Sequence, residues 1–318
     1  MNVPALPPGP VDGLLAGVDI GGTTTRVVLC GPGLGVECAA EVPTPAAHGG
    51  AAMTRAAFTA LDTLLDGEPR PLAGIGFGAA GVVDRVDGRI LVASDSFSGW
   101  AGFGVTDAAE AALGVPAFLD NDVNAFLRGE VAHGAAVGER HVLGMTLGTG
   151  VGGALWIDGA LYDGPHGAAG EIGHVPGFGD LHCSCGGRGH LETLAAGRAI
   201  TAGYARRTGR VRSAQEIADA AVRGDQDAAA VYERAGAAVA RALLITAGVL
   251  DVTTAVLGGG VSDAWTLLEP AIRAAVAEEP PVSGRPLRVV PSRLGRDAVA
   301  VGAAAHALTE LGAAVRTP

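Results

Sequence analysis

Apolar residues occur along this chain in short runs that end in glycine-rich turns. Residues 14–20 form one such run, a Gly-Gly-Thr turn follows it, and residues 26–30 form a second run. This pattern predicts two buried strands joined as a hairpin. The order of strand, glycine turn and strand returns at 142–147, 148–153 and 154–157. Two such units, each opening one half of the chain, predict a duplicated α/β architecture that holds a ligand between its halves.

Helical periodicity and further short apolar runs fill the rest of each half. In the first half we expect helices at 51–65, 106–113 and 123–131, strands at 72–77 and 117–119, and a hairpin over 82–91. In the second half we expect mostly helix over 214–250, strands at 254–257 and 287–290, and a final helix at 298–311. A chain of 318 residues exceeds the size at which one core keeps growing, so two domains are the default expectation.

The apolar content is high, at 48% of residues, but it is mostly Ala and Val. The longest apolar stretch, 235–250, contains Arg241 and is too short to span a bilayer. Residues 1–13 carry several prolines and no basic segment, so we expect a frayed tail and no signal peptide. Four cysteines in a chain of this length do not form a disulfide framework, and we expect a cytoplasmic protein with reduced thiols.

Every basic residue of the chain is an arginine, because the sequence contains no lysine. The net charge of −11 and the scattered arginines argue against nucleic-acid binding. The absence of lysine also excludes a Walker-type phosphate lysine and a Schiff base. Any phosphate must therefore be held by backbone N–H groups, hydroxyls, arginine or a metal ion.

Glycine turns at strand ends are candidate phosphate sites. Segment 19–23 reads Asp-Ile-Gly-Gly-Thr, which places a carboxylate at a strand end and bare N–H groups beside threonine hydroxyls. Segments 148–150 and 258–260 place similar turns at two other strand ends, where a nucleotide can lie against backbone. An ordinary tight turn explains each one alone, and the repetition favours a nucleotide site.

Two other motifs fail on closer reading. Segment 76–81 matches G-x-G-x-x-G, but a strand and a hairpin tip follow it where a dinucleotide site needs a helix. Segment 120–124 opens like a calcium loop, but Ala125 and Val131 occupy its turn-glycine and twelfth-ligand positions. A strand ending at residue 119 instead delivers Asn121 and Asp122 to a helix N-terminus, the edge at which α/β sheets bind ligands. An N-capping role for Asp122 is the competing interpretation.

Residues 171–192 gather two of the four cysteines, three of the eight histidines and three carboxylates in a glycine-rich stretch. The stretch has little apolar material of its own, and a zinc ion would hold it. The site is expected to be structural, because these ligands can fill all four positions. The candidate ligands are Cys183, Cys185, His174 and His190, with His182 as the spare. The metal would then fix Glu171 and Glu192 as substrate ligands.

Taken together, these motifs resemble the ROK family of repressors and sugar kinases, within the actin-like sugar kinase superfamily. The matching segments, which run in family order, are 19–23, 119–124, 148–153, 170–174, 183–192 and 257–260. The resemblance implies an α/β, two-lobed actin-like ATPase fold (ribonuclease H-like) with a zinc knuckle in the second lobe. It implies an N-terminal lobe at 1–121, onto which the helix of 296–318 packs back, and a C-terminal lobe at 122–295.

The resemblance also implies roles for individual residues. Asp122 is similar to the catalytic base, and the sugar ligands are Gly81, Asn121, Asp122, Glu171, His174 and Glu192. The residues expected at ATP and Mg²⁺ are Asp19, Gly21, Gly22, Thr23, Thr24, Thr149, Gly150, Gly259 and Gly260. The zinc set is His174, Cys183, Cys185 and His190, so that His174 would bond zinc through one ring nitrogen and sugar through the other.

Three positions depart from the family pattern. His190 stands where the third knuckle cysteine is usual, Ser96 where glucokinases carry a sugar-contacting Asn, and Thr24 where a lysine is common. The expected activity is ATP-dependent phosphorylation of a hexose, most of all glucose, at its terminal hydroxyl. N-acetylmannosamine or N-acetylglucosamine kinase is the nearest alternative. A sugar-binding transcriptional regulator is less favoured, because the Asp19 motif leaves little room ahead of it for a winged helix. The resemblance implies a homodimer or homotetramer.

Overall fold

The computed structural model describes residues 12–94 and 96–314, so the expected tail lies mostly outside the described residues. The chain forms two compact units, each with its own five-stranded sheet. The first unit comprises Met1–Val137 and Arg296–Pro318, and the second comprises Gly138–Gly295. Among the described residues, no helix combines the length and the apolar character that crossing a membrane requires.

The sheet of the first unit has the strand order β3-β2-β1-β4-β7. It contains β1 (Leu14–Ile20), β2 (Thr24–Cys30), β3 (Val36–Pro43), β4 (Leu72–Ala79) and β7 (Ala117–Asn121). The first three strands pair antiparallel, whereas β4 and β7 run parallel to β1. The expected hairpin is therefore present, and the carboxyl ends of β1, β4 and β7 meet at one edge.

The sheet of the second unit repeats this topology strand for strand, in the order β10-β9-β8-β11-β12. Its strands are β8 (Val142–Leu147), β9 (Val151–Ile157), β10 (Ala160–Leu161), β11 (Thr254–Gly258) and β12 (Arg288–Pro291). Antiparallel pairs join β8 to β9 and β9 to β10, and parallel pairs join β8, β11 and β12. The duplication expected from the two strand–turn–strand units is confirmed.

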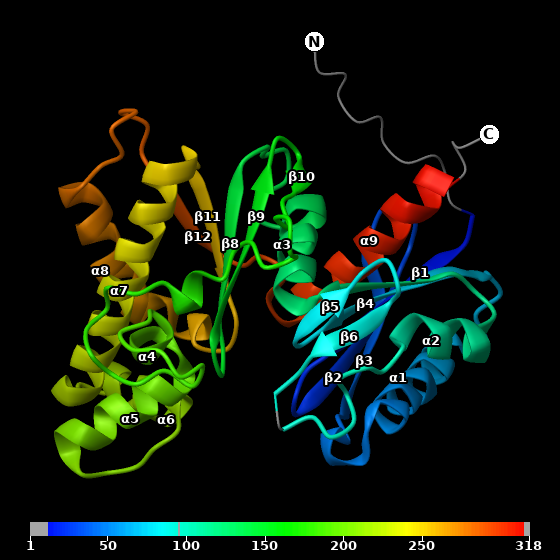
Figure 1. The fold of residues 1–318 in the computed structure, drawn as a ribbon, viewed down its shortest axis with the longest axis horizontal. Helices are drawn as coiled ribbons and strands as arrows, with labels where there is room; N and C mark the ends of the chain where they lie inside the picture. The colour runs from blue at the N-terminus through cyan, green and yellow to red at the C-terminus, as the bar shows by residue number, and fades with distance from the viewer. Residues whose placement is uncertain (1–11, 95, 315–318) are drawn as a thin grey trace. The chain divides into compact units, whose positions relative to one another are not determined.

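Helices cover both faces of the first sheet (Figure 1). On one face, α1 (Gly50–Leu65) and α2 (Val105–Leu113) pack their apolar side chains against alternate residues of β1. On the other face lies α9 (Ala298–Ala314), which also contacts α3 (Asp122–His133). The short hairpin of β5 (Val82–Asp84) and β6 (Arg89–Val92) follows β4.

Glycines allow α9 to lie directly on the backbone of its neighbours. A Cβ atom at Gly17 of β1 or at Gly76 of β4 would overlap a carbonyl oxygen of α9. A Cβ atom at Gly302 of α9 would in turn overlap the carbonyl oxygen of Ala125 in α3. Because no side chain fits between these elements, glycine sets the distance at which the helix packs.

This packing places the border between the units later than expected. We expected the second lobe to begin at residue 122, but α3 belongs to the first unit, which runs to Val137 before the chain returns to it at Arg296. The reason is tertiary, since α3 makes its most extensive helix contact with α9. The sequence order alone carries no trace of this contact.

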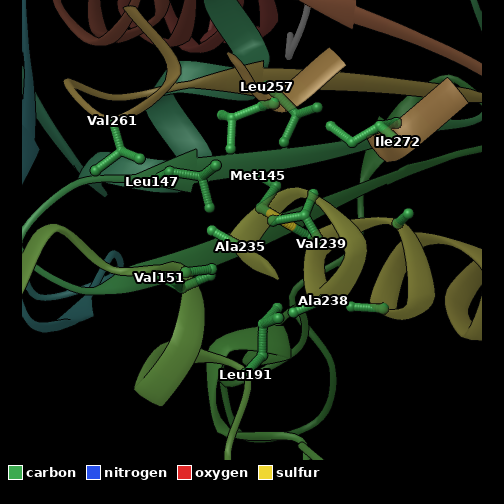
Figure 2. Packing of buried hydrophobic residues seen from close by; sticks show 14 of the residues in the cluster. Met145, Leu147, Val151, Leu191, Ala235, Ala238, Val239, Leu257, Val261 and Ile272 are labelled. Atoms are coloured by element: carbon green, nitrogen blue, oxygen red, sulfur yellow. The ribbon is translucent and has the colours of Figure 1, made fainter. Parts of the chain in front are cut away.

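The second unit is built around a long helix, α7 (Gln226–Leu250). Figure 2 shows Ala235 and Val239 of this helix pointing toward Met145 and Leu147 of β8. The other helices are α4 (Glu192–Ala195), α5 (Gly197–Thr208), α6 (Ala214–Val222) and α8 (Trp265–Glu278). Of these, α4, α5 and α8 are additions to the elements that the periodicity predicted.

Candidate functional site

The turn between β1 and β2 has Asp19 beside its glycines. The Gly21 N–H donates to the Thr24 carbonyl over 3.1 Å, which closes the turn and leaves Gly22 and Thr23 exposed at its tip. Burial and, to a smaller extent, the negative charge of Asp122 together raise the pKa of Asp19 to about 8. A divalent cation bound near two carboxylates that repel each other would stabilise their ionised forms.

Asn121 caps the helix that carries Asp122. Its side-chain oxygen accepts hydrogen bonds from the N–H groups of Val123 at 2.8 Å and Asn124 at 3.3 Å. Asp122 is therefore the first residue of α3, and the interpretation of Asp122 as the N-cap is wrong. The physical reason is that β7 ends at Asn121, whose extended backbone suits a cap residue.

The loop after β4 is tied to this helix start. The side-chain NH₂ of Asn121 donates to the Gly81 carbonyl over 2.9 Å, and the Trp100 ring nitrogen donates to the Ala80 carbonyl over 3.2 Å. Gly81 has a φ of +112°, which favours glycine, and a Cβ there would overlap the Val92 carbonyl. Ser96 is exposed and its hydroxyl lies 2.6 Å from that of Ser94.

The glycine turns of the second unit lie next to each other. Gly259 has a φ of +85°, and a Cβ on it would come within 2.6 Å of the Leu147 carbonyl oxygen. The N–H of Val261 donates to that same oxygen over 2.8 Å, and Val261 lies beside Leu147 in Figure 2. The Gly197 N–H, at the start of α5, donates to the Gly148 carbonyl over 2.8 Å. These contacts bring the turns at 148–150 and 258–260 together, with the first residue of α5 beside them.

The four expected zinc ligands form one cluster. One ligand atom from each of His174, Cys183, Cys185 and His190 can be chosen so that all lie within 4.8 Å of one another. The Sγ of Cys183 lies 3.7 Å from Nδ1 of His174, and the Sγ of Cys185 lies 3.3 Å from Nδ1 of His190. Donor atoms around a tetrahedral zinc ion are roughly 3.3–3.8 Å apart, so this cluster fits the ion.

His174 has its two ring nitrogens in different surroundings. Nδ1 faces the cysteine cluster, whereas Nε2 lies 3.9 Å from a carboxylate oxygen of Glu171, one turn earlier. Glu171 is exposed, and both residues belong to a short helical turn around Ile172–His174. A metal ion on Nδ1 would therefore orient the imidazole and direct its other nitrogen toward the side of Glu171.

Glu192 is only 6% exposed and has several partners that the sequence did not reveal. Its carboxylate accepts from the Val151 N–H over 3.0 Å, from the Ser184 hydroxyl over 3.2 Å and from Arg198. Through Val151 it joins the knuckle to the glycine turn between β8 and β9. Arg198 follows Glu192 by six residues across a helix break, a spacing with no recognisable periodic signal.

Asp120 had no role of its own in the predictions from sequence. It is fully buried, and its carboxylate accepts from Arg128 Nε over 2.8 Å, from the Asn124 side chain over 3.1 Å and from the Asn121 N–H over 2.9 Å. The only local signal was a charged residue at the end of an apolar strand.

A family model describing the ROK family matches residues 15–310. The chain belongs to the ROK family. Its similarity to a glucokinase of Halalkalibacterium halodurans is 34% identity, covering 90% of this chain and 92% of that protein. A glucokinase of Thermotoga maritima is 33% identical, with 91% of this ROK chain and 96% of that protein covered. The family expected from the motifs is thus confirmed.

Solved structures give the same result for the fold. A ROK family glucokinase from Streptomyces griseus, solved with glucose and AMPPNP, is 30% identical, with a TM-score of 0.81 over 93% of this chain and 100% of that chain. A ROK hexokinase from Thermus thermophilus is 31% identical, with a TM-score of 0.79 over 94% of this chain and 99% of that chain. The expected fold class, two actin-like α/β lobes with a His/Cys cluster in the second, is confirmed.

Proposed function

We propose that this ROK protein phosphorylates a hexose at its terminal hydroxyl with ATP, and that glucose is the substrate and glucose 6-phosphate the product. The observation that carries the proposal is similarity to glucokinases along about nine-tenths of the chain, at 34% and 33% identity. The glucose and AMPPNP in the Streptomyces griseus relative support the choice of both substrates.

In this proposal Asp122 is the general base. It accepts the proton of the sugar hydroxyl while that oxygen attacks the γ-phosphorus of ATP and the bond to the bridging oxygen of ADP breaks. General-base catalysis contributes roughly 10²–10⁴-fold in rate. The N-terminus of α3 stabilises the negative form of this side chain, which is the form that accepts a proton. The sugar would be held by Gly81, Asn121, Glu171, His174 and Glu192.

The phosphates would be held without a lysine. Backbone N–H groups and hydroxyls supply the donors, from Gly21, Gly22, Thr23, Thr24, Thr149, Gly150, Gly259 and Gly260. Asp19 would hold Mg²⁺, and the repulsion between Asp19 and Asp122 fits a cation at this place. When bound, Mg²⁺ neutralises charge on the transferred phosphoryl group.

Zinc in this proposal is structural. The two thiols and two imidazoles around 174–190 provide four donors, which completes a tetrahedral shell and leaves no position for a reactive water. The role of the ion would be to hold the knuckle and orient His174. His182 is exposed and lies outside the His/Cys cluster, so the proposal leaves it out of the ligand set.

A coupled ADP-release assay over a panel of sugars tests the proposal. The panel contains glucose, mannose, fructose, N-acetylglucosamine, N-acetylmannosamine and a blank without sugar, all with Mg²⁺ and ATP. We expect turnover with glucose. Silence across the panel from folded, zinc-loaded protein would refute the kinase activity and favour a sugar-binding regulator.

The Asp122→Asn variant tests the catalytic role separately. We expect kcat to fall roughly 10²–10⁴-fold while glucose binding, measured by calorimetry, persists. Asp107→Asn is the matched control, because Asp107 is also an acidic residue in the first turn of a helix of the same unit. Near-normal turnover by Asp122→Asn would remove Asp122 from its assigned role.

N-acetylmannosamine kinase is a second candidate because of one specific match. The N-acetylmannosamine kinase of Salmonella typhimurium is 31% identical over 83% of this chain. Ser96 lies where glucokinases usually carry an asparagine, which would alter a contact to the sugar. Turnover confined to N-acetylmannosamine in the same panel would select this candidate over glucose.

A further inference from the structure

The carboxylate of Asp120 joins four elements of the first unit. Asp120 lies on β7, and its carboxylate accepts hydrogen bonds from the side chains of Asn124 and Arg128 of α3. One of its oxygens lies 3.7 Å from NH1 of Arg85, at the tip of the β5–β6 hairpin. His306 of α9 places Nδ1 at 4.0 Å from the same carboxylate oxygen. These contacts therefore fix Asp120 relative to the start of α3, which carries Asp122.

The side chains around Asp120 are buried, which indicates that they fix a particular geometry. Asp120 is 0% exposed, and the side chain of Arg128 is 13% exposed. A buried ion pair gives little net stability compared with apolar side chains of similar size, because both charges lose their hydration. Such a pair is best explained when it fixes a particular arrangement, which here includes the first turn of α3.

Two chains of hydrogen bonds run from Asp120 to residues assigned to the sugar. In the first, the Asn121 N–H donates to the Asp120 carboxylate. The Asn121 side chain in turn accepts from the N–H groups of Val123 and Asn124 and donates to the Gly81 carbonyl. The other passes through the Asn124 side chain, one turn from the Asp120 carboxylate. A shift of the Asp120 carboxylate would move both the helix start and the loop at Gly81.

We propose that Asp120, clamped by Arg128, is a positioning residue that holds Asp122 in the orientation needed for proton transfer. The proposal rests on the proposed function, because it assigns the sugar-phosphorylating step to Asp122. Asp120 itself touches no reacting atom. Its action goes through the backbone at Asn121 and through the first turn of α3.

The first test is Asp120→Asn, which keeps the size and one acceptor oxygen but removes the charge that holds Arg128. We expect kcat to fall roughly 10- to 100-fold, as small misplacements of reacting groups do, with the KM for glucose changed less than threefold, about the scatter of such comparisons. Asp225→Asn is the matched control, since Asp225 is a helix-capping carboxylate in the other unit that also bonds a tyrosine. It should lower the melting temperature and leave kcat unchanged.

A double variant separates positioning from stability. Asp120→Asn leaves Arg128 buried with a neutral partner, so the melting temperature should fall. Asp120→Asn combined with Arg128→Met removes that uncompensated charge, and we expect the melting temperature to recover while kcat stays low. Recovery of kcat together with the melting temperature would overturn the proposal, because Asp120 would then act only on stability.

Amide hydrogen exchange supplies a readout that needs no catalysis. The N–H groups of Val123 and Asn124 bond to the Asn121 side chain, and we expect both to exchange faster in Asp120→Asn. If the wild-type protein phosphorylates no sugar, the proposed function fails, and this exchange still decides whether Asp120 orders the start of α3. Unchanged exchange at both amides would overturn the positioning role whatever the activity.

Discussion

His306 is expected to make the first unit sensitive to acid. It lies on α9, is 5% exposed, and its Nδ1 is buried with no hydrogen-bond partner among the residues that the structure describes. The pKa of His306 is lowered from 6.5 to about 4, chiefly by burial and also by the positive charges of Arg128 and Arg85, with Asp120 opposing. Nε2 lies 3.5 Å from a carboxylate oxygen of Glu310. The imidazole is therefore neutral in the folded protein at neutral pH.

The sign of the effect follows from the two pKa values. Because the pKa is lower in the folded state, the unfolded chain binds the proton more tightly, and stability is lost as the pH falls from about 6.5 toward about 4. Above pH 6.5 the contribution is fully present. With these values, the free energy of unfolding at pH 5 is lower than at pH 7.5 by about 2 kcal/mol from His306 alone.

The assay is a pH titration of the histidine Cε1–H signals by NMR, together with urea unfolding of the full chain at pH 7.5 and at pH 5. His306→Phe is the comparison variant, since it keeps a ring against Phe118, whose centroid lies 6.0 Å away, and does not titrate. The stability of wild type relative to this variant should fall by about 2 kcal/mol between the two pH values. His133, exposed at the end of α3, is the reference signal. A His306 signal that titrates near pH 6.5, or an equal pH dependence in the variant, would refute the reasoning.

Two further predictions concern packing and the metal. Gly302→Ala should lower the free energy of unfolding by about 3 kcal/mol or prevent folding, because its Cβ would overlap the Ala125 carbonyl. Gly33 has open space around it, so Gly33→Ala should have little effect in the same urea titration. His190→Ala should lose zinc during dialysis against a chelator, measured by metal analysis, while His190→Cys should retain it, because thiolate is also a zinc ligand. Full zinc retention by His190→Ala would exclude His190 from the ligand set.

The elements that the sequence predicted well are those whose signal is local. The hairpin of β1 and β2 is marked by an apolar run, a Gly-Gly-Thr turn and a second run, and β8 occupies the predicted residues, 142–147. The cluster of His174, Cys183, Cys185 and His190 was also predicted, because these residues are close in sequence and of a distinctive chemical type. Spacing and residue type carry such information without any knowledge of the fold.

Elements whose stability comes from a partner were missed. Strand β3 contains two glutamates and two alanines, and only its pairing with β2 makes it a strand. Helix α8 contains Pro270, which interrupts the helical signal, yet Leu268 and Ile272 are buried in the core of the second unit. Local propensity is weak compared with the burial that tertiary packing provides.

The sequence by itself determined most of the strands, the glycine turns, the His/Cys cluster and the position of Asp122 after a buried strand, because each depends on residues close together in the chain. Only the tertiary structure decided that α3 and α9 belong to one unit, that Glu192 bonds to the turn at Val151, and that Asp120 holds Arg128. Each of these contacts joins a buried polar group or bare backbone to an element that only folding brings near. Their energy comes from satisfying those groups in the absence of water, which no periodic pattern records.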